Sequence, residues 1–276
     1  MTQKLALFSN NLTRLGILIL VSVWISGCVQ PEDTNSNSLD GTWIDLTYEF
    51  SDETIYWPTS EPFHMDTVAV GYMEGGFYYE SYQVATAEHG GTHLDAPIHF
   101  AAGKQSTEEI PLERLIGPAH VIDVSAQAAS DRDYLVSVDD FTNWEQEHGE
   151  LAAGAIVLIR TGYGNYWPDA ESYLGTALRG PDGVANLHFP GLHPDAAQWL
   201  VDNREIDALG IDTASIDYGQ STTYDSHQIL FSANIPAFEN VANLDQMPAT
   251  GAQVVALPMK IKNGSGGPLR IVARLP

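Results

Sequence analysis

The chain has 276 residues, with 12 basic and 36 acidic side chains and a formal net charge of −24 at pH 7. A chain this acidic repels polyanions, which argues against nucleic acid and anionic lipid surfaces as partners. The single cysteine, Cys28, excludes an internal disulfide and a cysteine-rich structural zinc site.

Residues 1–27 have the pattern of an export signal. Lys4 and Arg14 form a basic start, and an apolar run follows over residues 15–24. The run is short for a bilayer span, so it predicts a cleaved signal. The next residues, I-S-G-C, end at Cys28 and resemble the lipobox of bacterial lipoproteins. The resemblance implies that Cys28 is lipidated and that the protein is an exported membrane lipoprotein on the periplasmic or cell-surface side. A plain signal peptide or a signal anchor is the alternative.

Beyond the signal, the sequence predicts one tether and one domain. Residues 28–40 are polar and rich in Asn and Ser, which is typical of a flexible tether. Residues 41–276 show no internal repeat and no second linker of low complexity, so we expect a single domain.

Within that domain, short strand patterns alternate with one clear helix pattern. We expect strands over 43–50, 77–85, 119–124, 155–159, 208–212, 254–259 and 269–273. The helix is expected over 194–203, where Pro194 and Asp195 suit a first turn. Residues 263–268, N-G-S-G-G-P, predict a turn between the last two strands. The mixed order of strands and helix indicates an α/β fold with a mixed sheet.

A dense histidine motif, H-G-G-T-H-L-D-A-P-I-H, occupies residues 89–99. His89, His93 and Asp95 are residue types that hold zinc and similar divalent metal ions. The two glycines after the first histidine let the backbone fold back, so that several side chains can aim at one point. His99 is close enough along the chain to serve as a ligand or as a proton carrier.

Two further donors lie far along the chain. His227, in S-H-Q-I-L, and Glu239, in I-P-A-F-E-N, are flanked by apolar residues, where an unpaired polar side chain is costly. Spacing alone favours a satisfied core histidine and a surface glutamate. Two roles also fit Asp212 and Asp217, in G-I-D-T-A-S-I-D, since each could bind a ligand or cap a turn.

The segment 89–100, H-G-G-T-H-L-D-A-P-I-H-F, resembles the signature of the metal-dependent cyclase family, which contains bacterial kynurenine formamidases and isatin hydrolases. Segments 115–124, 156–163, 189–200 and 208–217 follow in the family's order. The resemblance runs from about residue 45 to the end of the chain. It implies a swivelling β/β/α domain and a homodimer.

The resemblance also implies a ligand set. It makes His89, His93 and Asp95 metal ligands, as in isatin hydrolases with a single ion. In the formamidases the set extends to His227 and Glu239, with Asp95 as the bridge between two ions. One or two zinc or manganese ions per chain are therefore both expected.

The same resemblance gives His99 the role of acid and base, and it places Tyr56 and Trp57 in an aromatic wall of the substrate pocket. Ordinary packing is the alternative for these two aromatic residues. The implied reaction is hydrolysis of an amide C–N bond in a small aryl substrate, with N-formylkynurenine as the first candidate and an isatin-type cyclic amide or lactone as the second. A non-catalytic lipoprotein that binds a metal or a small molecule is the alternative from another class.

Overall fold

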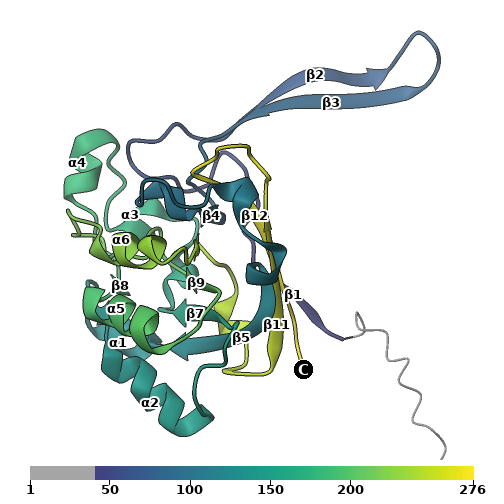
Figure 1. Cartoon of the computed structure of the whole chain (residues 1–276). Helices are drawn as coiled ribbons and strands as arrows, with labels where there is room; N and C mark the ends of the chain where they lie inside the picture. Colours follow the sequence, from purple (N-terminus) through teal and green to yellow (C-terminus); the bar gives the residue numbers. More distant parts are fainter. Residues whose placement is uncertain (1–40) are drawn as a thin grey trace, which may run out of the picture. The chain divides into compact units, whose positions relative to one another are not determined.

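Eight strands form one mixed sheet in the computed structural model, which describes residues 41–276. They are β1 (Trp43–Asp45), β4 (His93–Asp95), β5 (Ile116–Asp123), β7 (Ile156–Arg160), β9 (Ala208–Ile211), β10 (Ala237–Glu239), β11 (Ala252–Pro258) and β12 (Gly266–Arg274). The order is β1-β12-β11-β5-β7-β9-β10-β4, and β4 also pairs with β12, so the sheet closes into a barrel (Figure 1). The predicted signal, lipidation site and tether in residues 1–40 lie outside the described residues.

Strand β7 shows how the sequence supports this arrangement. Residues 156–159 are apolar at every position and fully buried, because both faces of the strand are covered. Leu158 packs in the cluster that contains Phe238 of β10. Val157 packs in a second cluster, with Leu200 from a covering helix. Successive side chains of a strand point to opposite faces. This one apolar run therefore packs both in the barrel interior and against the helical layer.

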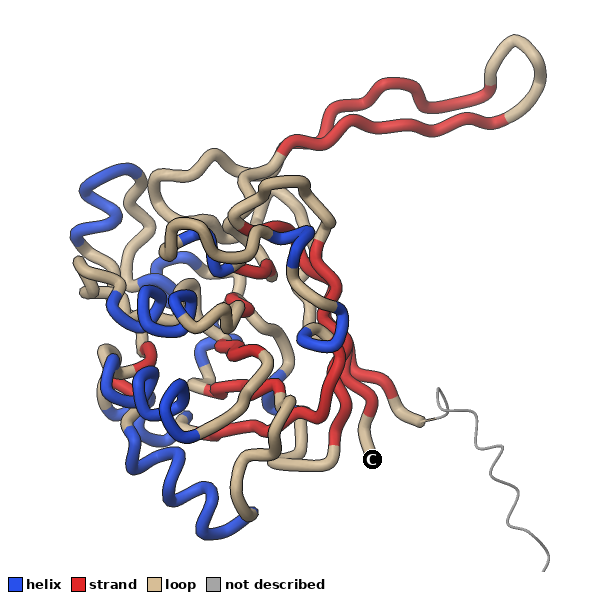
Figure 2. Tube along the Cα trace, in the orientation of Figure 1, coloured by secondary structure: helices blue, strands red, loops and turns tan. Residues whose placement is uncertain are grey.

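The helices gather on one side of the sheet, as Figure 2 shows. They are α1 (Ser125–Ser130), α2 (Val138–His148), α3 (Ala170–Leu174), α4 (Gly180–Ala185), α5 (Pro194–Asn203) and α6 (Asp225–Ser232). The helix expected over 194–203 is confirmed at both ends, and Nδ1 of His193 caps it by accepting from the backbone N–H of Asp195 at 3.0 Å. Two short strands, β6 (Leu135–Val136) and β8 (Gly191–Leu192), pair in parallel beside this layer. Within residues 41–276, every helix is too short or too polar to cross a membrane.

A two-stranded arm of β2 (His64–Tyr72) and β3 (Tyr78–Ala85) projects from the barrel (Figure 1). The strand expected over 77–85 is confirmed as β3, whereas β2 was not predicted. A register shift between Thr67 and Ala69 interrupts the alternation of β2, which hides it from pattern analysis. Cross-strand partners share a face, so one face of the arm, called the arm face below, carries exposed Met65, Val70, Tyr72, Tyr78, Tyr82 and Val84.

The remaining strand predictions are confirmed in place but not always in length. Residues 43–50 were expected as one strand, and only Trp43–Asp45 pairs with β12. The N–H of Tyr48 donates to Oγ1 of Thr92 at 2.9 Å, which draws the chain away from the sheet edge. Propensity does not reveal such a side-chain partner.

The turn expected over 263–268 is wrong for its last three residues. Gly266, Gly267 and Pro268 pair with β4 as the first part of β12. A Cβ at Gly266 would lie 2.5 Å from the carbonyl oxygen of Leu94, so this close backbone approach requires glycine. The residues that signal a turn in sequence are the ones that close the barrel.

Candidate active site

The histidine motif folds as a tight turn followed by strand β4. Gly91 has φ of +57°, a conformation that favours glycine. A Cβ at Gly90 would lie 2.0 Å from Cδ1 of the Tyr56 ring, so this position has no room for a side chain. The turn brings the ring centroids of His89 and His93 to 5.4 Å.

Asp95 lies at the centre of the site and contacts three histidines. Its Oδ1 lies 2.6 Å from Nδ1 of His89 and 3.1 Å from Nε2 of His93. Its Oδ2 lies 3.3 Å from Nε2 of His227. Each carboxylate oxygen therefore faces a different part of the histidine cluster.

Strand pairing and helix α6 bring the two distant donors to the same point. Glu239 lies opposite His93 in the antiparallel pairing of β10 with β4. Its Oε2 is 3.4 Å from Nε2 of His93, and its Oε1 is 3.2 Å from Nε2 of His227. Both Glu239 and His227 are buried. The structure therefore excludes the surface glutamate that spacing alone favoured.

The outer ring nitrogens of two histidines are held by fixed acceptors. Nδ1 of His93 lies 2.9 Å from the carbonyl oxygen of Gly91, and Nδ1 of His227 lies 2.6 Å from Oδ2 of Asp217. Such acceptors fix the ring orientation and turn Nε2 toward the centre of the site. Asp217 also accepts from the backbone N–H groups of Ser226 and His227, so it anchors the start of α6 as well.

The donor set fits a divalent metal ion. Nε2 of His93 is buried and makes no hydrogen bond to any described residue, although oxygens of Asp95 and Glu239 lie within 3.4 Å. The donor atoms of His93, Asp95 and Glu239 lie within 4.8 Å of one another, and so do those of His89, Asp95 and His99. Imidazole nitrogen with carboxylate oxygen is the mixture that zinc and manganese accept.

The electrostatics of the site demand positive charge. Burial raises the pKa of Asp95, but the charges of His89 and His93 and a hydrogen bond from His227 hold it well below its usual range. Burial lowers the pKa of His93, but its attraction to Asp95 and Glu239 raises it to about 10. Protons on His93 and His227 balance the buried carboxylates here, and a divalent cation would displace those protons on binding.

His99 differs from the other histidines in this cluster. It ends a short 3-10 turn (Pro97–His99), and its ring stacks on that of His89 at a centroid distance of 3.9 Å. Burial lowers the pKa of His99 to about 4, against the opposing attraction of Asp95. His99 is therefore neutral at pH 7 and able to accept a proton.

A cavity of about 300 Å³ opens over this cluster. Its lining includes all the ligand and acid–base residues predicted from sequence: His89, His93, Asp95, His99, His227 and Glu239. Tyr56 and Trp57, which were expected to form an aromatic wall of the substrate pocket, also line the cavity. Among the described residues, neither lysine nor arginine contributes to this lining.

Comparison with known proteins agrees with this geometry. Residues 44–218 match the family described as putative cyclase. The chain belongs to the cyclase family. An isatin hydrolase of Roseibium aggregatum is 36% identical over 211 residues, which cover 74% of this chain and 77% of that protein. A kynurenine formamidase of Salinibacter ruber is 30% identical over 232 residues, covering 84% of this chain and 96% of that protein.

A solved member of the cyclase family has the same fold. Isatin hydrolase A from Labrenzia aggregata, bound to benzyl benzoate, matches with a TM-score of 0.76 and 34% identity over 85% of this chain and 93% of that chain. The resemblance and the mixed α/β fold expected from sequence are confirmed. This member of the cyclase family is therefore a hydrolase, and the non-catalytic alternative is set aside.

Several residues of this cyclase-family cavity were not expected from the sequence. Phe100 and Tyr224 line it, and neither was singled out. Phe100 directly follows the histidine motif, which was an available signal. Tyr224 lies three residues before His227, and nothing in its sequence context distinguishes it. Asp217 was left open between a ligand and a turn cap, and the structure shows it orienting His227.

Replacing the acceptor behind His227 tests whether that histidine binds metal. In Asp217→Asn the carboxylate no longer holds Nδ1 of His227, so we expect metal affinity to fall about 10- to 100-fold. Competition with a chromogenic chelator measures this affinity. Asp202→Asn, an exposed change on α5, is the control and should bind metal like the wild type. Full metal affinity in Asp217→Asn would contradict the assignment of His227.

Proposed function

We propose that this protein hydrolyses the amide C–N bond of a compact, uncharged aryl lactam or amide, with isatin-type ring opening as the first candidate. The observation that carries the proposal is the His/Asp/Glu cluster lying at an aromatic cavity, to whose lining residues 41–276 contribute no lysine or arginine. The isatin hydrolase relative, 36% identical, supports it. So does the uncharged aryl ester, benzyl benzoate, held by a related isatin hydrolase.

N-formylkynurenine is the second candidate, and a kynurenine formamidase relative supports it. This substrate carries an α-carboxylate and an α-ammonium group beside its aryl amide. A carboxylate brought into a partly buried site needs a cationic partner, for which arginine is the usual choice. Among the described residues, histidines are the only side chains of the lining that can carry a positive charge, and they surround buried carboxylates, so an uncharged substrate fits better.

The proposed metal is zinc or manganese, held by His89, His93 and Asp95, with His227 and Glu239 completing the set for a second ion. When bound, such an ion polarises a carbonyl group and lowers the pKa of water, to about 7 in favourable zinc sites. His93 and His227 suit this role because the carbonyl oxygen of Gly91 and the carboxylate of Asp217 fix the orientations of their rings.

His99 supplies the proton transfers in this proposal. Neutral at pH 7, it accepts a proton from the water that attacks the amide carbonyl. As the C–N bond breaks, the same proton passes to the leaving nitrogen. The products are a carboxylic acid and an amine, which remain joined in one molecule when the substrate is a lactam.

Substitution of His99 separates its proton-transfer role from metal binding. In His99→Gln we expect kcat for isatin to fall by at least about 100-fold, while metal content stays at the wild-type level. Turnover is followed by the loss of isatin absorbance, and metal content by mass spectrometry. His148→Gln, outside the cavity, is the matched control. Loss of metal in His99→Gln would show that His99 is a ligand instead, and parallel assays with N-formylkynurenine decide between the two substrates.

We propose that two copies associate through the arm face. Its six apolar and aromatic side chains are between 41% and 82% exposed, and Glu80 on the same face accepts from the hydroxyls of Tyr78 and Tyr82. A soluble domain rarely leaves such a group of apolar side chains uncovered. Among the described strands, β2 and β3 pair only with each other, and the exposure of the arm face makes it available to a second copy.

Light scattering tests this association. The wild-type domain should have twice the chain mass, and the double variant Tyr72→Ser/Tyr78→Ser should shift toward a monomer because it loses two aromatic side chains at the tip of the arm face. Leu112→Ser, which changes another exposed apolar residue far from the arm in sequence, is the control. A wild-type monomer at micromolar concentration would contradict the proposal.

We propose that the full chain is an exported lipoprotein anchored through Cys28, on the strength of the lipobox-like I-S-G-C. Expressed in a bacterial host, the full chain should incorporate labelled palmitate and enter the detergent phase, whereas Cys28→Ser should do neither. Ser38→Ala is the control. A membrane-bound Cys28→Ser protein with an uncleaved N-terminus would indicate a signal anchor instead.

A further inference from the structure

Tyr224 has an unfavourable backbone conformation directly beside the cavity. Its φ of 53° and ψ of 46° lie in the left-handed region, which bulky residues rarely adopt. It precedes the first residue of α6, the helix that carries His227. Strained residues of this kind persist only where the surrounding structure holds them, and they concentrate at ligand sites.

Neighbouring groups hold this conformation. The N–H of Tyr224 donates to Oγ of Ser221 at 3.0 Å, and its carbonyl oxygen accepts from the N–H of Gln228 at 3.1 Å. The side chain of Gln228 also donates to the carbonyl oxygen of Thr223 at 2.6 Å. The turn is therefore fixed on both sides of Tyr224, and the direction of its side chain is set before any substrate binds.

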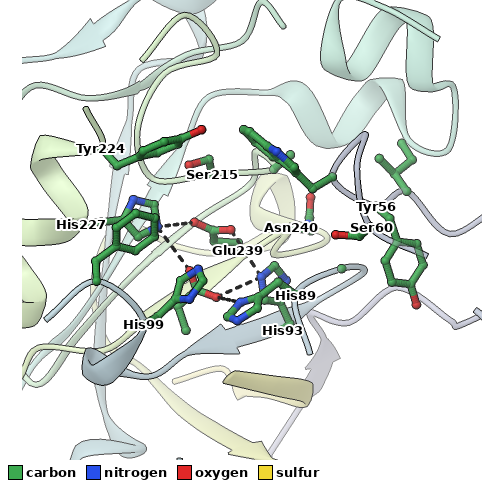
Figure 3. Close-up of a pocket in the computed structure, with 16 residues that line it drawn as sticks. Tyr56, Ser60, His89, His93, His99, Ser215, Tyr224, His227, Glu239 and Asn240 are labelled. Carbon is green, nitrogen blue, oxygen red and sulfur yellow. Dashed lines mark hydrogen bonds and ion pairs between the residues drawn. The ribbon is translucent and has the colours of Figure 1, made fainter. Parts of the chain in front are cut away.

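The ring of Tyr224 belongs to a group of three neighbouring aromatic rings in the cavity. Its centroid lies 5.2 Å from that of Phe100 and 6.4 Å from that of Trp57. All three rings are half-buried and line the cavity, so each has a part that packs and a part that faces open space. Figure 3 shows Tyr224 extending from the α6 side, with its hydroxyl end pointing across the cavity.

The hydroxyl of Tyr224 has no hydrogen-bond partner among the described residues, in contrast to the other cavity tyrosine. The hydroxyl of Tyr56 lies 2.6 Å from Oγ1 of Thr86, as expected for a ring that serves packing. A tyrosine that served only packing at position 224 would gain from a similar partner or from phenylalanine. A free donor above the metal-fitting cluster is suited to a ligand.

We propose that Tyr224 determines substrate specificity in this cavity. Its ring packs on the aryl ring of the substrate, and its hydroxyl donates a hydrogen bond to a second polar group on that substrate, apart from the amide that is cleaved. The proposal rests on the proposed function for the identity of the amide. Tyr224 selects aryl substrates with a further carbonyl on the ring system, such as isatin, over simple aryl amides such as formanilide.

The test compares Tyr224→Phe, which removes only the hydroxyl, with Tyr224→Asn, which removes the ring but tolerates the left-handed backbone. Tyr166→Phe, a change at an exposed tyrosine outside the cavity lining, is the control. We measure kcat and KM for isatin and formanilide, and the Kd of isatin for metal-free protein by calorimetry. Circular dichroism confirms that each variant is folded.

In Tyr224→Phe we expect KM and Kd for isatin to rise about fivefold, with little change for formanilide, so that the preference for isatin falls by the same factor. Tyr224→Asn should weaken the binding of both substrates by at least about tenfold, since this variant also loses the ring contact. Metal content should not change in either variant.

Unchanged KM, Kd and selectivity in both Tyr224 variants would overturn the proposal. An equal rise in KM for both substrates in Tyr224→Phe would overturn it too. If wild-type protein binds isatin without turnover and Tyr224→Phe still weakens that binding, the proposed reaction fails while the role of Tyr224 stands. If wild-type protein neither binds nor hydrolyses isatin, both proposals fail.

Discussion

The burial of Asp95 beside Glu239 is the constraint on which the rest of the site depends. Two carboxylates removed from water cost on the order of several kcal/mol each unless positive charge lies next to them. Three histidines surround Asp95. They provide this positive charge either by carrying protons or by holding a divalent cation. The fold therefore has to deliver these side chains from distant segments to one buried point, and closure of the sheet achieves this.

Closure depends on where β4 lies. This three-residue strand pairs with β10 on one side and with β12 on the other. The first pairing puts Glu239 opposite His93, and the second is possible because Gly266 lets the backbone approach Leu94. The helical layer adds His227 from α6, with Asp217 fixing its ring. Barrel, helix and turn each contribute one part of the same charge balance.

The cavity separates its two tasks by location. The metal-fitting groups come from β4, β10, α6 and the turn before β4 that carries His89. Aromatic residues of three separate loops and turns, Trp57, Phe100 and Tyr224, surround the open space above them. Strands hold the reacting geometry rigidly, and loops are the segments that vary most easily among related proteins. A common hydrolytic centre can therefore serve different aryl substrates when the loop residues change.

The sequence by itself determined what depends on near neighbours in the chain: the histidine motif, the buried run of β7 and helix α5 at both ends. It left His227 and Glu239 open until family resemblance was considered. Glu239 reaches His93 through strand pairing and His227 reaches Asp95 from α6, each across more than a hundred residues of sequence. Only the tertiary structure decided the barrel closure at Gly266, the arm strand β2 and the cavity position of Tyr224. Each of these depends on a contact with a distant segment or on a backbone irregularity, and propensity and spacing encode neither.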